Sequence, residues 1–232
     1  MSARKRSTAI TSRRPGWFVY GSLAVVLVAA MFPFYWSFLI GSGDQSTIYQ
    51  DLTWIPGGNF IENAMTVIAN PAVNFWKALS NSIIVSTTTA VSTVILSTLA
   101  GFAFAKLRFK GSGPLLVAVI ATMAVPVQLG VVPLYIVMQE FGWTGNIGAV
   151  ILPGLVTAFG VFWMTQYLQQ SLPTELIEAA RVDGCSMIRT FWHVGLPAAR
   201  PAAAMLFLFT FVFSWNNFFW PFIVLDRQNP TL

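Results

Sequence analysis

Long runs without a single ionisable side chain constrain this chain most. Five such runs occupy residues 17–40, 83–105, 114–138, 147–168 and 202–225. A helix that rises about 1.5 Å per residue needs about 20 apolar residues to cross a hydrocarbon layer about 30 Å thick. Strands of a membrane barrel are about half that length and alternate in polarity. The runs therefore predict an all-α, polytopic membrane helix bundle with five visible spans.

Basic residues are distributed unevenly between the segments that connect these runs. The tail at 1–16 has Arg4, Lys5, Arg6, Arg13 and Arg14, the link after the second run has Lys106, Arg108 and Lys110, and the 169–201 loop has Arg181, Arg189 and Arg200. The alternate segments have only Lys77 and Arg227. Because basic segments stay in the cytoplasm, the tail and the 169–201 loop are predicted to be cytoplasmic and the 41–82 loop external.

The net charge of +5 is explained by basic residues in the segments predicted to be cytoplasmic, so it does not require a nucleic-acid partner. We interpret the tail as a topology determinant beside anionic membrane lipid. The single cysteine, Cys185, excludes an internal disulfide, and the single histidine, His193, leaves no metal cluster. No lysine follows a glycine, so the phosphate-binding pattern G-x-x-x-x-G-K-[ST] is absent. We therefore expect a non-catalytic chain that binds no cofactor or metal itself and takes its energy from elsewhere.

The cytoplasmic loop is predicted to contain two short helices. Residues 173–182 begin with a proline and an acidic first turn and continue with good helix formers. Gly184 suits a chain reversal. A second helix at 186–193 then precedes Leu196 and Pro197, where we expect the chain to turn back into the membrane. Such a compact knob is suited to insertion into a groove of a partner.

The same loop contains a spaced motif: Glu178-Ala179-Ala180, three residues, Gly184, nine residues, Val194, one residue, and Leu196-Pro197. This spacing resembles the signature loop of permease subunits of binding-protein-dependent ABC importers, with valine where the family often has isoleucine. The basic tail, an external loop that ends near Asn81-Ser82, and the segment 214–225 (S-W-N-N-F-F-W-P-F-I-V-L) are similar to the smaller maltose-type permease of the carbohydrate-uptake branch.

The resemblance implies a type I importer permease fold with six spans, so that a sixth would follow the five visible ones. It implies transport of a sugar, a di- or oligosaccharide, across a bacterial plasma membrane, with residues 17–232 as a single transmembrane permease domain. It further implies a second homologous permease subunit, two ATPase subunits that hold ATP and Mg²⁺, and an extracytoplasmic solute-binding protein.

The resemblance also implies a role for each motif residue in coupling to the ATPase. Ala179 and Ala180 would allow a close approach of the ATPase surface, and Gly184 would permit the bend. Glu178 would form a bond within the loop or to the ATPase. Neighbouring aliphatic side chains would add apolar contact: Leu176, Ile177 and Val182. The alternative is that the loop only packs under its own bundle.

Polar residues inside the runs are candidates for the sugar path. Asn216 and Asn217 lie near the middle of the last run, Trp215 beside them could stack on a sugar ring, and Gln128 lies in the third run. The alternative for the amides is hydrogen bonding between helices, including those of the partner permease. Prolines in the third and fourth runs can kink helices, for packing or for gating: Pro126, Pro133 and Pro153.

Two other classes of membrane protein fit the sequence less well. A self-sufficient ion-coupled secondary transporter or channel commonly uses ionisable groups within the membrane, and the five runs have none. A membrane enzyme would need a constellation of acid, base, nucleophile or metal that is not evident. A permease driven by partner ATPases is therefore the preferred function, with the ion-coupled transporter or channel as the alternative.

Overall fold

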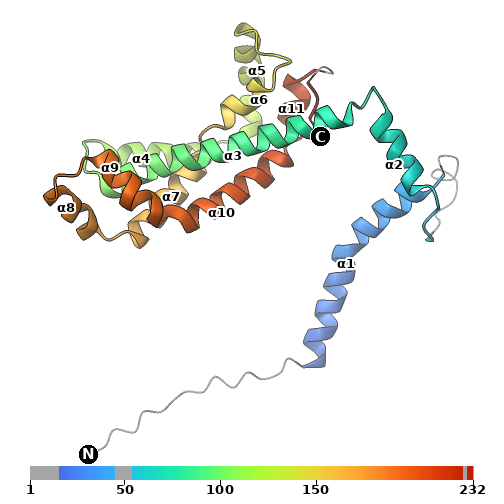
Figure 1. The fold of residues 1–232 in the computed structure, drawn as a ribbon, viewed down its shortest axis with the longest axis horizontal. Coiled ribbons are helices and arrows are strands. Elements are labelled where there is room, and N and C mark those ends of the chain that lie inside the picture. The colour runs from blue at the N-terminus through green and yellow to red at the C-terminus, as the bar shows by residue number, and fades with distance from the viewer. Residues whose placement is uncertain (1–15, 45–53, 227–228, 232) are drawn as a thin grey trace, which may run out of the picture. The chain divides into compact units, whose positions relative to one another are not determined.

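The structure is a computed structural model that describes residues 16–44, 54–226 and 229–231 (Figure 1). Within these ranges the secondary structure is helical and includes no strand. The basic residues of the tail at 1–15, and Arg227, lie outside the described residues, so the orientation predicted from them stays a prediction. The chain divides into two compact units, Met1–Asn70 and Pro71–Leu232.

The first unit contains two helices. α1 (Trp17–Ser42) is the apolar helix predicted for the first span, and α2 (Phe60–Ala69) is a short helix in the segment predicted to be external. Asn63 of α2 donates from Nδ2 to the carbonyl oxygens of Gly41 and Gly43, at 3.0 and 2.9 Å. The last carbonyls of a helix lack intrahelical donors, so the Asn63 amide caps the end of α1.

Three long helices form the centre of the second unit. α3 (Phe75–Lys106) packs along α7 (Ala158–Ser171) and α10 (Leu196–Trp215), which also contact each other. The three ribbons run side by side in Figure 1. A Cβ atom at Gly101 of α3 would lie 2.6 Å from Met164 Cβ and 2.8 Å from the carbonyl carbon of the same residue. A small residue is therefore required where α3 crosses α7, as is common between membrane helices.

Two side chains inside the second unit form hydrogen bonds between its segments. Thr93 of α3 donates from Oγ1 to the carbonyl oxygen of Gly154 at 2.8 Å. Trp163 of α7 donates from Nε1 to the carbonyl oxygen of Ala202 in α10 at 3.2 Å. Because a hydrocarbon layer offers no hydrogen-bond partners, such bonds hold neighbouring segments to one another.

The membrane-spanning segments follow the predicted runs in number and order. Four helical stretches are long and apolar enough to cross a membrane: Trp17–Ser42, Phe75–Lys106, Gly148–Ser171 and Met187–Trp215. A fifth is a pair of helices bent by 90°, formed by Ser112–Thr122 and Val127–Glu140. The described residues thus contain four spans, or five if the bent pair is one span, and the predicted all-α membrane helix bundle is confirmed.

The third run is not the single helix that its length predicts. α4 (Ser112–Thr122) ends early, and α5 (Val131–Glu140) begins only after a 3₁₀ turn, η1 (Val127–Gly130). Pro126, just before that turn, is extended, with φ −59° and ψ 127°. Proline also lacks the backbone donor that would continue the helix. The run is therefore broken at this proline and not merely kinked.

The limits of two other runs also differ from expectation. Asn81 and Ser82, predicted at the end of the external loop, lie inside α3. The last run is interrupted, because α10 ends at Trp215 and α11 (Phe219–Val224) follows after a short break. Hydropathy does not locate such limits, because a membrane helix can bury polar residues against its neighbours and an apolar segment can still be ended by local hydrogen bonds.

Candidate functional site

The predicted coupling loop begins with helix α8 (Thr174–Val182), where the first short helix was expected. Glu175 lies in its first turn and Arg181 in its last turn. Each charge is opposite in sign to the nearer end of the helix dipole and therefore stabilises the helix. Ile177 is only 2% exposed and belongs to the core, whereas Val182 is 88% exposed. One side of α8 is thus fastened to the bundle, and the other side is open to a partner.

Gly184 forms the left-handed turn that ends α8, with φ +74°. The Gly184 N–H donates to the carbonyl oxygen of Arg181 at 3.0 Å, and the Cys185 N–H donates to that of Ala180 at 2.9 Å. This pair of bonds is a Schellman motif, whose residue at the turn adopts positive φ and is usually glycine. Gly184 is exposed, and an added Cβ would meet nothing within 4 Å in this chain. The bend predicted at Gly184 is therefore present.

The second short helix is continuous with the last span, contrary to expectation. α9 (Met187–Thr190), a π-helical segment, η3 (Phe191–Gly195), and α10 form one helical stretch. Leu196 and Pro197 therefore do not turn the chain back into the membrane. A proline removes one backbone donor and crowds the carbonyl four residues earlier. The wider π-helical turn directly before Pro197 accommodates both effects without a break.

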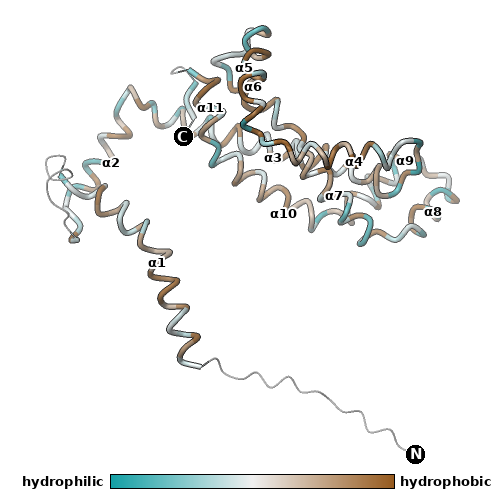
Figure 2. The backbone as a smooth tube through the Cα atoms, turned by 180° about the vertical axis from the view of Figure 1, so that it is seen from behind, coloured by the Kyte–Doolittle hydropathy of each residue, from teal (hydrophilic) through white to brown (hydrophobic). Residues whose placement is uncertain are grey.

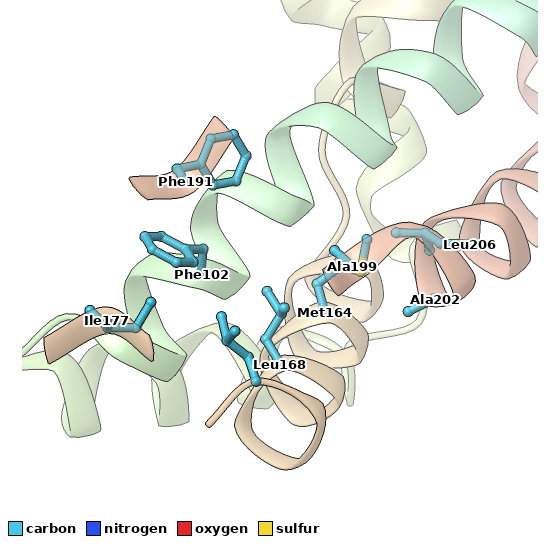
Figure 3. Close-up of a cluster of buried hydrophobic side chains, with 9 residues drawn as sticks. Phe102, Met164, Leu168, Ile177, Phe191, Ala199, Ala202 and Leu206 are labelled. Atoms are coloured by element: carbon cyan, nitrogen blue, oxygen red, sulfur yellow. The ribbon is translucent and has the colours of Figure 1, made fainter. Parts of the chain in front are cut away.

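A cluster of buried apolar side chains anchors the loop to the bundle (Figure 3). Phe102 of α3 and Phe191 of the π-helical segment meet edge to face, with ring centroids 5.4 Å apart. Gly195 permits this contact, because a Cβ there would lie 2.7 Å from the Phe102 ring. The other members lie in or next to α7, α8 and α10: Met164, Leu168, Leu172, Ile177, Ala199, Ala202 and Leu206. Because a close-packed interior transmits displacement, a movement of the loop would also displace the three central helices.

The motif residues divide into an exposed group and an anchoring group. The exposed positions are Glu178, Ala179, Gly184 and Pro197. The half-buried positions are Ala180, Val194 and Leu196, of which the last two pack against the core cluster. Within the described ranges the Glu178 carboxylate forms no hydrogen bond or ion pair, so its predicted bond within the loop is absent from this structure.

Sequence reasoning missed residues on both sides of the loop. Ile188 and Trp192 are 73% and 56% exposed, one helical turn apart, beside the hydrophilic stretches that Figure 2 shows at α8 and α9. Phe191 and Gly195 are also four residues apart, a spacing that places them on one helix face and that the sequence shows. Their contact with Phe102 could not be predicted from the sequence, because Phe102 lies far away along the chain.

The predicted path residues gather at the break after α10, except for one. Asn216 reaches the carbonyl oxygen of Val212 twice, from its backbone N at 3.1 Å and from Nδ2 at 2.8 Å. α10 ends directly before Asn216 and α11 begins at Phe219, so Asn216 and Asn217 do not lie in the middle of a continuous span. Gln128 is exposed on η1. It is distant from these residues in the sequence and lines neither of the two cavities next to them.

Two cavities adjoin Trp215, whose ring stacks on that of Phe211 with centroids 5.8 Å apart. The larger has a volume of about 290 Å³ and is lined by Ile83, Phe211, Val212, Trp215 and Asn216. The smaller is lined by Ser82, Val85, Ser86, Ser214, Trp215, Asn217, Pro221 and Thr231. Both linings include an aromatic ring and an amide, the hydroxyl groups line only the smaller cavity, and neither lining includes a charged side chain.

Comparisons with known proteins agree with these features. Residues 94–227 match the family described as binding-protein-dependent transport system inner membrane component. The sn-glycerol-3-phosphate transport system permease protein UgpE of Salmonella typhi is 29% identical over 217 residues, which cover 91% of this chain and 77% of that protein. UgpE of Escherichia coli K12 is 28% identical over 213 residues, covering 90% and 75%.

A solved structure shares the fold over nearly the whole chain. It is a chain from the crystal structure of a bacterial ABC transporter involved in the import of the acidic polysaccharide alginate. The two chains superimpose with a TM-score of 0.75 at 22% identity, over 94% of this chain and 80% of the other. The likeness at this identity is one of fold.

Proposed function

Because the chain belongs to the family of binding-protein-dependent transport system inner membrane components, we propose that it is the permease subunit of an ATP-driven sugar importer whose ATPase subunits dock on the 178–197 loop. The observation that carries the proposal is the two-sided loop. Ile177 and Phe191 are buried in the cluster shared with α3, α7 and α10, while Glu178, Ala179 and Gly184 are exposed.

In the proposed mechanism this chain moves but does not hydrolyse ATP. The two ATPase subunits hold ATP and Mg²⁺, and one of them receives α8 and the turn at Gly184 in a surface groove. Closure of the ATPase pair displaces α8. Because Ile177 and Phe191 pack in the same cluster as Phe102, this displacement moves the cytoplasmic ends of the central helices and alternately opens the path to either side.

We infer the assembly from the family of the chain and from the distribution of its basic residues. The chain is a multi-pass protein of the bacterial inner membrane, and we place the tail, the α3–α4 link and the coupling loop in the cytoplasm because of their basic residues. A second homologous permease completes the path, and a solute-binding protein delivers the sugar from the external side. In this assembly residues 17–232 act as a single permease domain. A self-sufficient ion-coupled transporter is not favoured, because the chain belongs to an importer family that uses separate subunits.

We propose a di- or oligosaccharide as the substrate. The groups next to the cavities suit sugar hydroxyls and ring faces: Trp215 offers an aromatic plane, and Asn216 and Asn217 offer amides. A second candidate is a phosphorylated polyol, because the curated relatives are named for sn-glycerol-3-phosphate. The two linings have no cation to pair with a phosphate, which favours the neutral sugar.

Stimulation of ATP turnover distinguishes the two substrates. With the cognate binding protein and the complete transporter, neutral di- and oligosaccharides are expected to stimulate turnover, and sn-glycerol 3-phosphate is not. The Trp215→Ala variant should reduce sugar-stimulated turnover about threefold to tenfold, since an aromatic contact contributes about 0.5 to 1.5 kcal/mol. Phe213→Ala is the matched control, because Phe213 lies on the same helix, is 71% exposed and lines neither cavity. Stimulation by the phosphate ester alone would reverse the assignment.

The single cysteine provides a direct test of docking. Cys185 is half-buried in the turn that follows Gly184. A membrane-impermeant maleimide is expected to label Cys185 in inside-out vesicles but not in intact spheroplasts. Addition of the ATPase subunits should slow the labelling at least about tenfold, because a docked interface excludes solvent and reagent. The Cys185→Ser variant gives the background. Labelling from the external side, or a rate unaffected by the ATPase, would contradict the proposed docking.

A further inference from the structure

We propose that the link between α3 and α4 binds the phosphate group of an anionic membrane lipid. A pocket of about 600 Å³ lies beside this link. Residues from the link, from the start of α4 and from the start of α8 line it, among them Lys106, Arg108, Phe109, Lys110, Ser112 and Thr174. The site is separate from the coupling motif and from the cavities beside Trp215, and only its assignment to the cytoplasmic leaflet rests on the proposed function.

The charge of the pocket favours an anion. Lys106, Arg108 and Lys110 line it without any acidic side chain. Arg108 and Lys110 are exposed and form no hydrogen bond or ion pair within the described ranges. Glu175, in the first turn of α8, interacts electrostatically with Lys106 but does not line the pocket. Two of the three cations are thus left to an external partner.

Hydroxyl groups line the same pocket as these cations. Gly111, with φ +86°, turns the chain so that Ser112 at the start of α4 lines the same pocket as the link. Thr174, the first residue of α8, lines it from the opposite segment. Hydroxyls are donors to phosphate oxygens, and cationic side chains provide the stronger, charge-assisted hydrogen bonds. Together, these cations and hydroxyls suit a single phosphate group whose oxygens are bound by different segments.

The position of the pocket favours a lipid over a soluble phosphate. Lys106 is the last residue of the 32-residue apolar helix α3, so the link lies at the end of a membrane span. The rings of Phe104 and Phe109 also line the pocket, with centroids 5.8 Å apart, and Phe109 is 40% exposed. Basic pockets beside spans bind lipid headgroups. The aromatic wall would contact the glycerol and upper acyl chains, which a free phosphate lacks.

Lipid titration of the complete transporter complex tests this site. Native mass spectrometry in detergent measures binding of dioleoylphosphatidylglycerol, with dioleoylphosphatidylcholine as the zwitterionic comparison. The wild-type complex is expected to prefer phosphatidylglycerol. The double variant Arg108→Gln/Lys110→Gln should bind it about 25-fold more weakly, from about fivefold for each cation near the headgroup. The double variant Lys77→Gln/Arg200→Gln is the matched control, because it removes the same charge from exposed positions outside the pocket and outside the 178–197 loop.

Two results would contradict a specific lipid site: equal affinity for the two lipids, or an equal loss of phosphatidylglycerol binding in the control variant. Displacement of the lipid by a large excess of inorganic phosphate would also overturn it, because it would assign the pocket to a soluble anion. If the double variant does not assemble, Lys110→Gln alone should still weaken binding about fivefold. Sugar-stimulated ATP turnover of the same preparations separates the two proposals. In the wild-type complex, the absence of a lipid preference together with sugar-stimulated turnover contradicts only the lipid site, and the absence of turnover together with normal lipid binding contradicts only the proposed function.

Discussion

Replacement of Gly101 by valine is expected to destabilise the membrane bundle by about 3 kcal/mol, the upper end of the usual cost of overpacking. An added Cβ would lie 2.6 Å from Met164 Cβ, 2.8 Å from the Met164 carbonyl carbon and 2.9 Å from the backbone nitrogen of Thr165. Two of these atoms are backbone atoms of α7, so a rotamer change cannot relieve the clash. The two helices must separate, and the packing along α3 and α7 is lost. Thermal unfolding of the purified complex in detergent measures the effect.

The matched control for Gly101 is a glycine with open space around it. Gly113, in the first turn of α4, would place an added Cβ within 4 Å of nothing. Gly113→Val therefore keeps the packing, and valine is a slightly better helix former than glycine. Its unfolding midpoint should stay near that of the wild type, whereas that of Gly101→Val should fall by about 10 °C. Equal midpoints for the two variants would show that α3 and α7 do not cross as closely as the structure has them.

The second large effect is expected for Gly184→Phe, which should reduce sugar-stimulated ATP turnover at least about tenfold while the permease still folds. An added Cβ at Gly184 would meet nothing within 4 Å in this chain, and Gly184 is exposed, so a large side chain would start from an open surface position. It would project from the exposed turn into the proposed ATPase groove, where overpacking costs about 1 to 3 kcal/mol. Co-purification of ATPase subunits with the permease and the turnover of the reconstituted complex measure the loss.

Loss of coupling in Gly184→Phe could arise from backbone strain at the turn or from a clash with the ATPase, and a second variant distinguishes the two causes. Gly184 has φ +74°, which costs other residues about 1 to 2 kcal/mol, and asparagine tolerates this conformation best. Gly184→Asn therefore keeps the turn with a short side chain and should retain most of the coupling. If Gly184→Phe assembles with the ATPase and responds to sugar as the wild type does, the loop does not transmit the force. If Gly184→Asn fails as completely as Gly184→Phe, strain rather than the interface is responsible.

Local chemistry explains which parts of the loop could be predicted. The start of α8 after Pro173 and the turn at Gly184 depend on φ preferences and on bonds within a few residues, so the sequence indicates them. The path beyond Gly184 could not be predicted in the same way. Leu196 and Pro197 normally indicate a helix limit, yet here the π-helical segment and the fit of Gly195 against Phe102 allow one helix to continue. That fit depends on a contact between residues distant in the sequence.

The candidate path shows the same division. The sequence identified Trp215, Asn216 and Asn217, and the structure brings them to two adjoining cavities. Gln128 was selected for the same reason, a polar side chain in an apolar run, but it lies on η1 after the break at Pro126. A polar residue in a span indicates that a partner is needed and does not say which segment provides it.

The sequence by itself determined the solvent of this protein, the order of its apolar segments, and the place of the E-A-A motif directly before the last of them. These properties depend on the length of apolar runs and on residue spacing, which are local. Only the tertiary structure decided that Glu178, Ala179 and Gly184 are exposed whereas Val194 and Leu196 pack against a buried cluster. It also decided that the loop is held through Phe102 and Gly195, and that the α3–α4 link forms a basic pocket with the start of α8. Each of these arises from close contact between distant segments, where shape and distance rather than residue type select the partner.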